Sequence, residues 1–149
     1  MMKLTMTAAA AAGVVFAASA VTRYWNATTQ TSSHYNWETA ANWLDEDGNT
    51  GVPQAGDDVV FNRGNQAWLG TSAALNSLTL AKGCNTYPIS QTSVVLASGG
   101  DGLWYTSDQS SLVIYCFLYF KGDGDVPVNI PSGKTLTVQK AYRQSSSQP

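Results

Sequence analysis

Short runs of apolar and β-branched residues, each followed by a cluster of turn residues, dominate the chain after residue 50. The periodicity of an amphipathic helix is nearly absent there, and short β-rich runs of this kind are typical of strands. Glycine with aspartate, serine or proline fills the clusters between the runs, as expected of turns. The runs are Asp58–Phe61, Leu75–Ala81, Ser93–Ala97, Leu112–Phe120 and Lys134–Val138. This pattern predicts an all-β chain.

The centres of these runs recur at a nearly constant spacing. Taken at Val60, Leu78, Val95 and Val113, they are 18, 17 and 18 residues apart, and Leu136 follows 23 residues later. No hairpin dipeptide such as Asn-Gly joins the runs, and a sandwich with strands every ~8–12 residues fits less well. A regular spacing is typical of coils that stack in one direction, each burying its apolar side on the next. We therefore expect residues 57–138 to form a short right-handed parallel β-helix, or β-solenoid.

Residues 21–56 differ from the repeating part of the chain. They contain three of the five tryptophans, Trp25, Trp37 and Trp43, among Asn, Thr and Ser. The first coil of a solenoid has an open end, where apolar core and unpaired backbone groups need cover. We expect residues 21–56 to be an aromatic-rich N-terminal cap.

The other end of the repeat has no such segment. Residues 139–149 are polar, with three serines in succession from Ser145, and have little to bury, so we expect a disordered tail there. The edge of the last coil still has to be paired or shielded. We therefore expect other protein chains or further coils to cover this C-terminal edge, either in a longer protein or through chains that stack end to end.

The first twenty residues have the composition of a secretory signal peptide. Lys3 precedes an apolar stretch from Ala8 to Phe16, and Ala18-Ser19-Ala20 is a small-x-small cleavage pattern. The apolar stretch is shorter than the ~20 residues that span a membrane, so we expect no membrane span in the mature chain. The sequence predicts export through a signal peptide at residues 1–20, and hence a secreted or cell-surface protein.

Charge excludes one class of partner. Only 12% of the 149 residues are charged, with 8 basic against 10 acidic residues and a net charge of -2. A basic platform for nucleic acid needs an excess of Lys and Arg. We expect no nucleic-acid partner.

The two cysteines leave two readings open. Cys84 and Cys116 form an even number, which suits one disulfide in an oxidising compartment. The alternative is that both are small buried hydrophobic residues, and the position of Cys116 within an apolar run favours it. Two cysteines and the single His34 do not supply the four ligands of a zinc site.

Several short motifs resemble the start of autotransporter-type β-helix passengers and related secreted repeat proteins. These are Trp25, Asn36-Trp37, Ala41-Asn42-Trp43, Val52-Pro53, Ala55–Phe61 and Leu75-x-x-Leu78-Thr79-Leu80, together with Ile130–Val138, which is similar to a recurrent coil of those proteins. The motifs cover residues 25–80 well and 126–138 moderately, and they are structural. The resemblance implies a parallel β-helix and surface export, and it names no catalytic residue. The few coils and the lack of a C-terminal barrel differ from a complete autotransporter.

We find no catalytic, cofactor or metal motif. Gly133-Lys134-Thr135 lacks the earlier glycine of a phosphate-binding loop, because position 128 is Val, and a strand follows it. Serine-hydrolase chemistry needs a base and an oxyanion hole as well as a hydroxyl, but His34 lies among Ser32, Ser33 and Tyr35, and the sequence has no G-x-S-x-G elbow. The carboxylates of Asp57, Asp58 and residues 45–47 lie in turn-like sequence, where Asp usually caps its own backbone. We expect no enzymatic activity and no cofactor.

Aromatic residues make up 11% of the chain and supply the only binding chemistry that we single out. Trp68, Trp104 and Tyr105 stand next to glycine or polar turns and are candidate glycan contacts, because an exposed ring can stack on a sugar. The alternative is that they pack over the edges of the coils. Leu112–Phe120 has no charge, so we expect both of its faces to be covered, one by the core and the other by a cap or partner chain.

These observations predict a secreted, non-enzymatic cell-surface or adhesin-like module. The alternative is a carbohydrate-binding module or an accessory piece of a polysaccharide-degrading β-helix enzyme.

Overall fold

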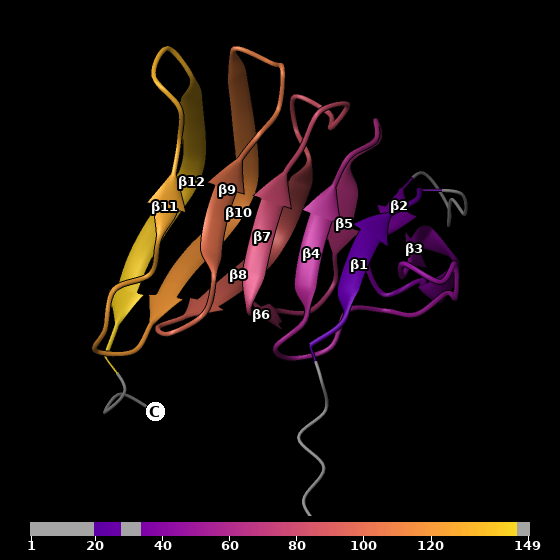
Figure 1. Cartoon of the computed structure of the whole chain (residues 1–149), viewed down its shortest axis with the longest axis horizontal. Helices are drawn as coiled ribbons and strands as arrows, with labels where there is room; N and C mark the ends of the chain where they lie inside the picture. The colour runs from indigo at the N-terminus through magenta and orange to yellow at the C-terminus, as the bar shows by residue number, and fades with distance from the viewer. Residues whose placement is uncertain (1–19, 28–33, 146–149) are drawn as a thin grey trace, which may run out of the picture.

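The computed structural model describes residues 20–27 and 34–145. The predicted signal peptide, apart from Ala20, and the last four residues of the predicted tail lie outside these ranges. The described chain is a stack of parallel β-coils, which runs from the indigo end to the yellow end in Figure 1.

Two sheets form the long sides of the stack. In sheet 1 the order is β11 (Val128–Asn129), β9 (Gly102–Tyr105), β7 (Ser77–Leu80), β4 (Asp58–Phe61), β1 (Thr22–Trp25) and β3 (Trp43–Leu44). In sheet 2 the order is β12 (Thr135–Gln144), β10 (Ser111–Lys121), β8 (Ile89–Ala97), β5 (Ala67–Leu69) and β2 (Tyr35–Asn36), and β6 (Ala73–Leu75) also pairs with β8.

Each central coil contributes one strand to sheet 1 and then one to sheet 2. The chain passes from β4 to β5 and β6, from β7 to β8, and from β9 to β10. Every named strand pair is parallel except β1 with β3, as expected of coils that stack in one direction. The prediction of an all-β, parallel β-solenoid with an aromatic cluster is confirmed.

The true repeat is longer than the predicted one. Ser77 pairs with Asp58, 19 positions earlier, and with Gly102, 25 positions later. On sheet 2, Val95 pairs with Tyr119, 24 positions later. The predicted step from Val60 to Leu78 is close to the true offset of strands β4 and β7, but the step from Leu78 to Val95 crosses from sheet 1 to sheet 2. The step from Val95 to Val113 lies within sheet 2 but does not join register partners.

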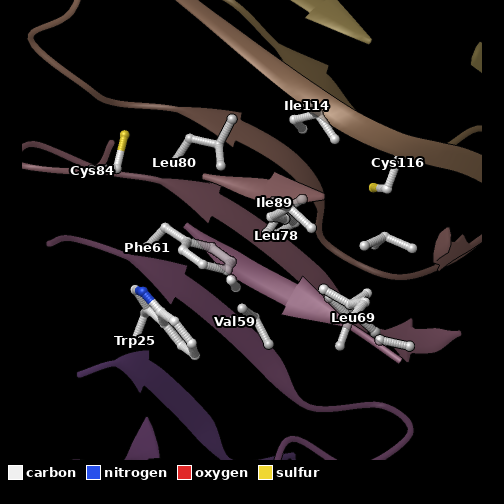
Figure 2. Packing of buried hydrophobic residues seen from close by; sticks show 14 of the residues in the cluster. Trp25, Val59, Phe61, Leu69, Leu78, Leu80, Cys84, Ile89, Ile114 and Cys116 are labelled. Atoms are coloured by element: carbon white, nitrogen blue, oxygen red, sulfur yellow. The ribbon is translucent and has the colours of Figure 1, made fainter. Parts of the chain in front are cut away.

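Alternate side chains of both sheets fill the space between them, which is the usual consequence of the two-residue period of a strand. On sheet 1, Val59, Leu78 and Leu103 occupy paired positions on successive coils and are at most 1% exposed. On sheet 2, Val94 and Leu118 are paired in the same way and are also buried. Figure 2 shows members of this core pointing inward from both sheets.

The aromatic cluster closes the N-terminal end of the stack. Trp43 lies edge-on to Trp25 and Trp37, with ring centroids 4.8 and 4.5 Å apart, and Phe61 joins them from β4. The indole N–H of Trp43 donates to the carbonyl of Trp37 at 2.6 Å. Between them, η1 (Ala40–Asn42) turns the chain back toward β3, and buried Asn42 donates its side-chain amide to the Asn36 carbonyl at 3.0 Å.

The predicted boundary between cap and coils at residue 56 differs from the structure. Strand β1 pairs with β4, and β2 pairs with β5, so residues 21–56 contain the first coil as well as its cover. Thr22 pairs with Asp58, 36 positions later, because the η1 and β3 segment is inserted into this coil.

Charge holds the inserted segment to the first coil. The guanidinium of Arg23 lies 3.5 Å from the Asp45 carboxylate and 3.9 Å from that of Asp57. Backbone hydrogen bonding, chiefly from Asn49, lowers the pKa of Asp45, and Arg23 acts in the same direction. Because a lowered pKa favours the charged form in the folded chain, this stabilisation is present above the ordinary pKa of Asp and is lost as the pH falls through the lowered pKa.

The C-terminal end is built differently from the prediction. Strand β12 continues to Gln144 and pairs with β10 as far as Lys121, so residues 139–144 are not a disordered tail. They form a strand because the long edge of β10 offers backbone partners to them, which the polar composition of the segment does not reveal. At this end Val128 continues the column of Val59, Leu78 and Leu103, yet its side chain is 49% exposed.

Candidate functional site

A shallow groove of about 500 Å³ crosses the outer face of sheet 1. It runs over β1, β4, β7 and β9, which are the front arrows of Figure 1. Six of its eight lining residues are polar, and the other two are a valine and a tryptophan: Thr22, Asp58, Val60, Ser77, Thr79, Asp101, Trp104 and Thr106.

The polar end of the groove comes from the turns that precede successive strands of sheet 1. Asn76 donates its backbone N–H to the carbonyl of Asp57 at 2.9 Å, and Gly102 donates to the carbonyl of Asn76 at 3.2 Å. Gly102 has φ +80, and a Cβ there would lie 2.1 Å from the carbonyl oxygen of Pro127 in the next coil. Only glycine fits this close approach of coils.

Asn76 links the two carboxylates of the groove. Its side-chain amide donates to Asp58 Oδ1 at 2.7 Å and to Asp101 Oδ2 at 3.0 Å. The Ser77 hydroxyl also donates to Asp58 Oδ1, at 2.5 Å. These bonds hold the oxygen acceptors of the two coils on either side of Asn76 in fixed positions along one wall.

Trp104 is the aromatic wall of the groove. Its side chain is 38% exposed, and its indole N–H donates to the carbonyl of Asp101 at 2.7 Å. It pairs in register with Thr79 of β7 and Asn129 of β11. The ring is therefore held in one orientation beside hydroxyl and carboxylate groups.

The three predicted glycan contacts do not share a surface. Trp104 lies on the outer face of sheet 1, whereas Trp68 lies on β5 in sheet 2, half-buried and stacked on His34 with ring centroids 3.8 Å apart. Tyr105 is 1% exposed, and its hydroxyl donates to the carbonyl of Gln109 at 3.0 Å. Burial also raises the pKa of Tyr105. The assignment of Tyr105 as a glycan contact is wrong, because neighbouring residues of β9 point to opposite sides of the sheet.

The two cysteines are free thiols, and the predicted Cys84–Cys116 disulfide is absent. Figure 2 shows them at opposite sides of the core, with Leu80 and Ile89 between them. Cys84 lies in the turn after β7 and contacts the Ser107 hydroxyl at 3.5 Å, whereas Cys116 faces inward from the middle of β10. Burial raises the pKa of Cys84, and it raises that of Cys116 to about 12.

The acidic residues at 45–47 do not gather into a site. Asp45 accepts the backbone N–H groups of Asp47 and Asn49 at 3.1 and 2.8 Å, so its carboxylate closes its own turn. Within residues 20–27 and 34–145, no three His, Cys, Asp or Glu residues are placed to hold a metal ion together. None of the helices in these same ranges is long and apolar enough to cross a membrane.

Two groups of residues were not identified from the sequence. Asn76 was not singled out because its role depends on the turns of three coils that only the fold brings together. On sheet 2, Tyr115, Phe117 and Tyr119 point outward from β10, while Ile114, Cys116 and Leu118 point into the core. The alternation of aliphatic or thiol with aromatic residues along this run indicates two different faces. Tyr115 is 49% exposed within the chain itself, and the cover of this outer face by a cap or partner chain stays a prediction.

Comparison with known proteins found no matching family model, no matching curated protein and no matching solved structure. The resemblance to autotransporter-type passengers therefore stays a prediction.

Burial of both thiols determines how the native protein reacts with a thiol reagent. We expect neither Cys84 nor Cys116 to be modified rapidly by a disulfide-based reagent at mildly alkaline pH, because the thiolate is the reactive form and burial disfavours it. After unfolding in concentrated guanidinium chloride without reductant, both should react. An unfolded chain that yields no reactive thiol would instead establish the disulfide.

Proposed function

We propose that this protein is a non-enzymatic, exported surface module of the adhesin type, which binds carbohydrate in the groove of sheet 1. The observation that carries the proposal is the exposed Trp104 ring, fixed beside the carboxylates of Asp58 and Asp101. An aromatic ring offers an apolar surface to the C–H groups of a sugar. Oxygen acceptors and hydroxyl groups around it match the hydroxyl groups of the same sugar.

The groove is organised before a ligand arrives. The hydrogen bond from Trp104 to the backbone and the bonds from Asn76 to both carboxylates restrict these side chains. Less side-chain entropy is then lost on binding, which favours affinity at a shallow site. The two carboxylates also favour a neutral or amino sugar over an acidic one.

Binding without bond cleavage agrees with the hydrogen bonding of the acids. A glycosidase needs one carboxylic acid that gives a proton to the leaving oxygen. Here Asp58 Oδ1 accepts two hydrogen bonds and Asp101 Oδ2 accepts one, so both groups are used as acceptors. Attached to a polysaccharide-degrading enzyme, the same groove would serve as its carbohydrate-binding module.

The second part of the proposal concerns the C-terminal end of the stack, where another chain or further coils cover the last coil. Val128 and Ile130 are 49% and 37% exposed, and Leu136 and Val138 are only partly buried against the core. Strand β12 has one paired edge, toward β10, in sheet 2. An apolar end with an open strand edge favours association with another strand.

Replacement of Trp104 tests the groove. On a glycan array, we expect the wild-type protein to bind neutral or amino sugars and Trp104→Ala to bind about tenfold less tightly or worse, as for a central aromatic contact. Trp68→Ala is the matched control, because Trp68 lies on the other sheet. Thermal unfolding should be nearly unchanged in Trp104→Ala. Failure of every neutral or amino sugar to bind, or equal binding by Trp104→Ala, would contradict the proposed groove.

Substitutions that introduce charge at the C-terminal end of the stack test the proposed association with another chain. We expect the purified protein to exceed the monomer mass in size-exclusion chromatography with light scattering, and Val128→Lys/Ile130→Lys to shift it toward the monomer. Tyr87→Lys is a control of similar exposure (43%) that lies away from this end, in the turn before β8. A monodisperse wild-type monomer at all concentrations would show that the end needs no partner.

A further inference from the structure

The outer face of sheet 2 carries a second, chemically different surface. Five of its aromatic residues make ring contacts and are called the aromatic face: Tyr87, Tyr115, Phe117, Tyr119 and Tyr142. Tyr87, Tyr115 and Tyr142 are 43%, 49% and 38% exposed, so the rings are available to a ligand. Exposed apolar patches of this kind usually mark interaction sites.

The rings of the aromatic face support one another. Tyr119 and Tyr142, paired across β10 and β12, are stacked with centroids 4.9 Å apart. Phe117 lies edge-on to Tyr142 at 5.9 Å, and Tyr115 stacks on Tyr87 at 5.3 Å. At the paired positions, β8 presents Ser93 to Phe117 and Val95 to Tyr119, which are smaller side chains. The rings of β10 therefore border a lower strip of surface, formed by the smaller side chains of β8. At ~3.3 Å per residue, the part of β10 that borders this strip, from Tyr115 to Lys121, is about 20 Å long.

Positive charge flanks the stacked pair. Lys140 pairs with Phe117, and Lys121 follows Tyr119 by two residues, so both lysines share the outward face. Strands β8, β10 and β12 contain no Asp or Glu, although the whole chain has a net charge of -2. The other cation of these strands is Arg143, whose guanidinium donates to the backbone carbonyls of Asp123 and Gly124 at 3.4 Å. These carbonyls lie in the turn after β10, and this turn also contains the acids nearest in sequence to β10, Asp123 and Asp125.

We infer that the aromatic face binds an acidic polysaccharide, whose sugar rings stack on the tyrosines while its carboxylate groups meet Lys121 and Lys140. Charge complementarity carries this choice of ligand. The groove of sheet 1 has two carboxylates and no cation among its lining residues, whereas the strands of sheet 2 have cations and no carboxylate. The two outer faces thus select opposite ligand charges.

Nucleic acid fits this face less well, although bases also stack on aromatic rings. Its affinity depends on many phosphate contacts and on a positive field around the site. Here two lysines face the strip, and the chain as a whole is negative.

Affinity electrophoresis and calorimetry with polygalacturonate test the inference. The matched ligand is fully methyl-esterified polygalacturonate, which has the same sugar backbone without the charge. The variants are Lys121→Gln/Lys140→Gln, with Lys82→Gln as control, because exposed Lys82 lies in the turn after β7. Oligothymidylate tests the nucleic-acid alternative, and thermal unfolding checks that each variant is folded.

We expect the wild-type protein to bind polygalacturonate and to bind the esterified polymer about tenfold less tightly or worse. The affinity of Lys121→Gln/Lys140→Gln for polygalacturonate should fall about tenfold, whereas that of Lys82→Gln should stay within about twofold of the wild type. Trp104→Ala should bind polygalacturonate normally, so this result is independent of the groove. The inference is overturned by absent binding, by equal affinity for the esterified polymer, by an unchanged affinity in the double lysine variant, or by tighter binding of oligothymidylate.

Discussion

The burial of inward-pointing side chains between two parallel sheets is the interaction on which the rest of the structure depends. Columns such as Val59, Leu78 and Leu103 place an apolar residue of each coil directly on that of the coil before it. Each fully buried aliphatic side chain contributes ~1.5–3 kcal/mol relative to an exposed one. Because a coil buries its apolar side only with neighbouring coils, the ends of the stack are its weak points.

The two ends are treated differently for this reason. At the N-terminal end, the inserted segment with Trp37 and Trp43 covers the first coil, and the ion pairs of Arg23 tie its loop down. At the C-terminal end, Val128 occupies the equivalent column with half of its surface exposed. The same architecture leaves two broad outer faces, and the outward-pointing alternate residues of their strands form the two proposed binding surfaces.

The fold class was predictable because strand runs and turn clusters are local signals. The two-sheet repeat was not, since a run such as Ser93–Ala97 does not reveal whether it follows Leu75–Ala81 within one coil or stacks on it. The same ambiguity affects the site: Trp104 and Tyr105 are adjacent, and only the phase of β9 decides that the first faces the groove and the second the core. The Asn76 bridge depends on three coils at once, and no spacing along the chain indicates it.

Disulfide trapping of β8 to β10 tests the parallel stacking most directly. The variants Val95→Cys/Tyr119→Cys and Ala97→Cys/Lys121→Cys join paired positions, and adjacent strands ~4.8 Å apart are within reach of a disulfide. Parallel strands keep a constant offset between partners, so both variants should cross-link rapidly under mild oxidation, with the bond located by peptide mass spectrometry. Antiparallel strands allow at most one of these pairs, so a cross-link in only one variant, or in neither, would contradict the parallel solenoid.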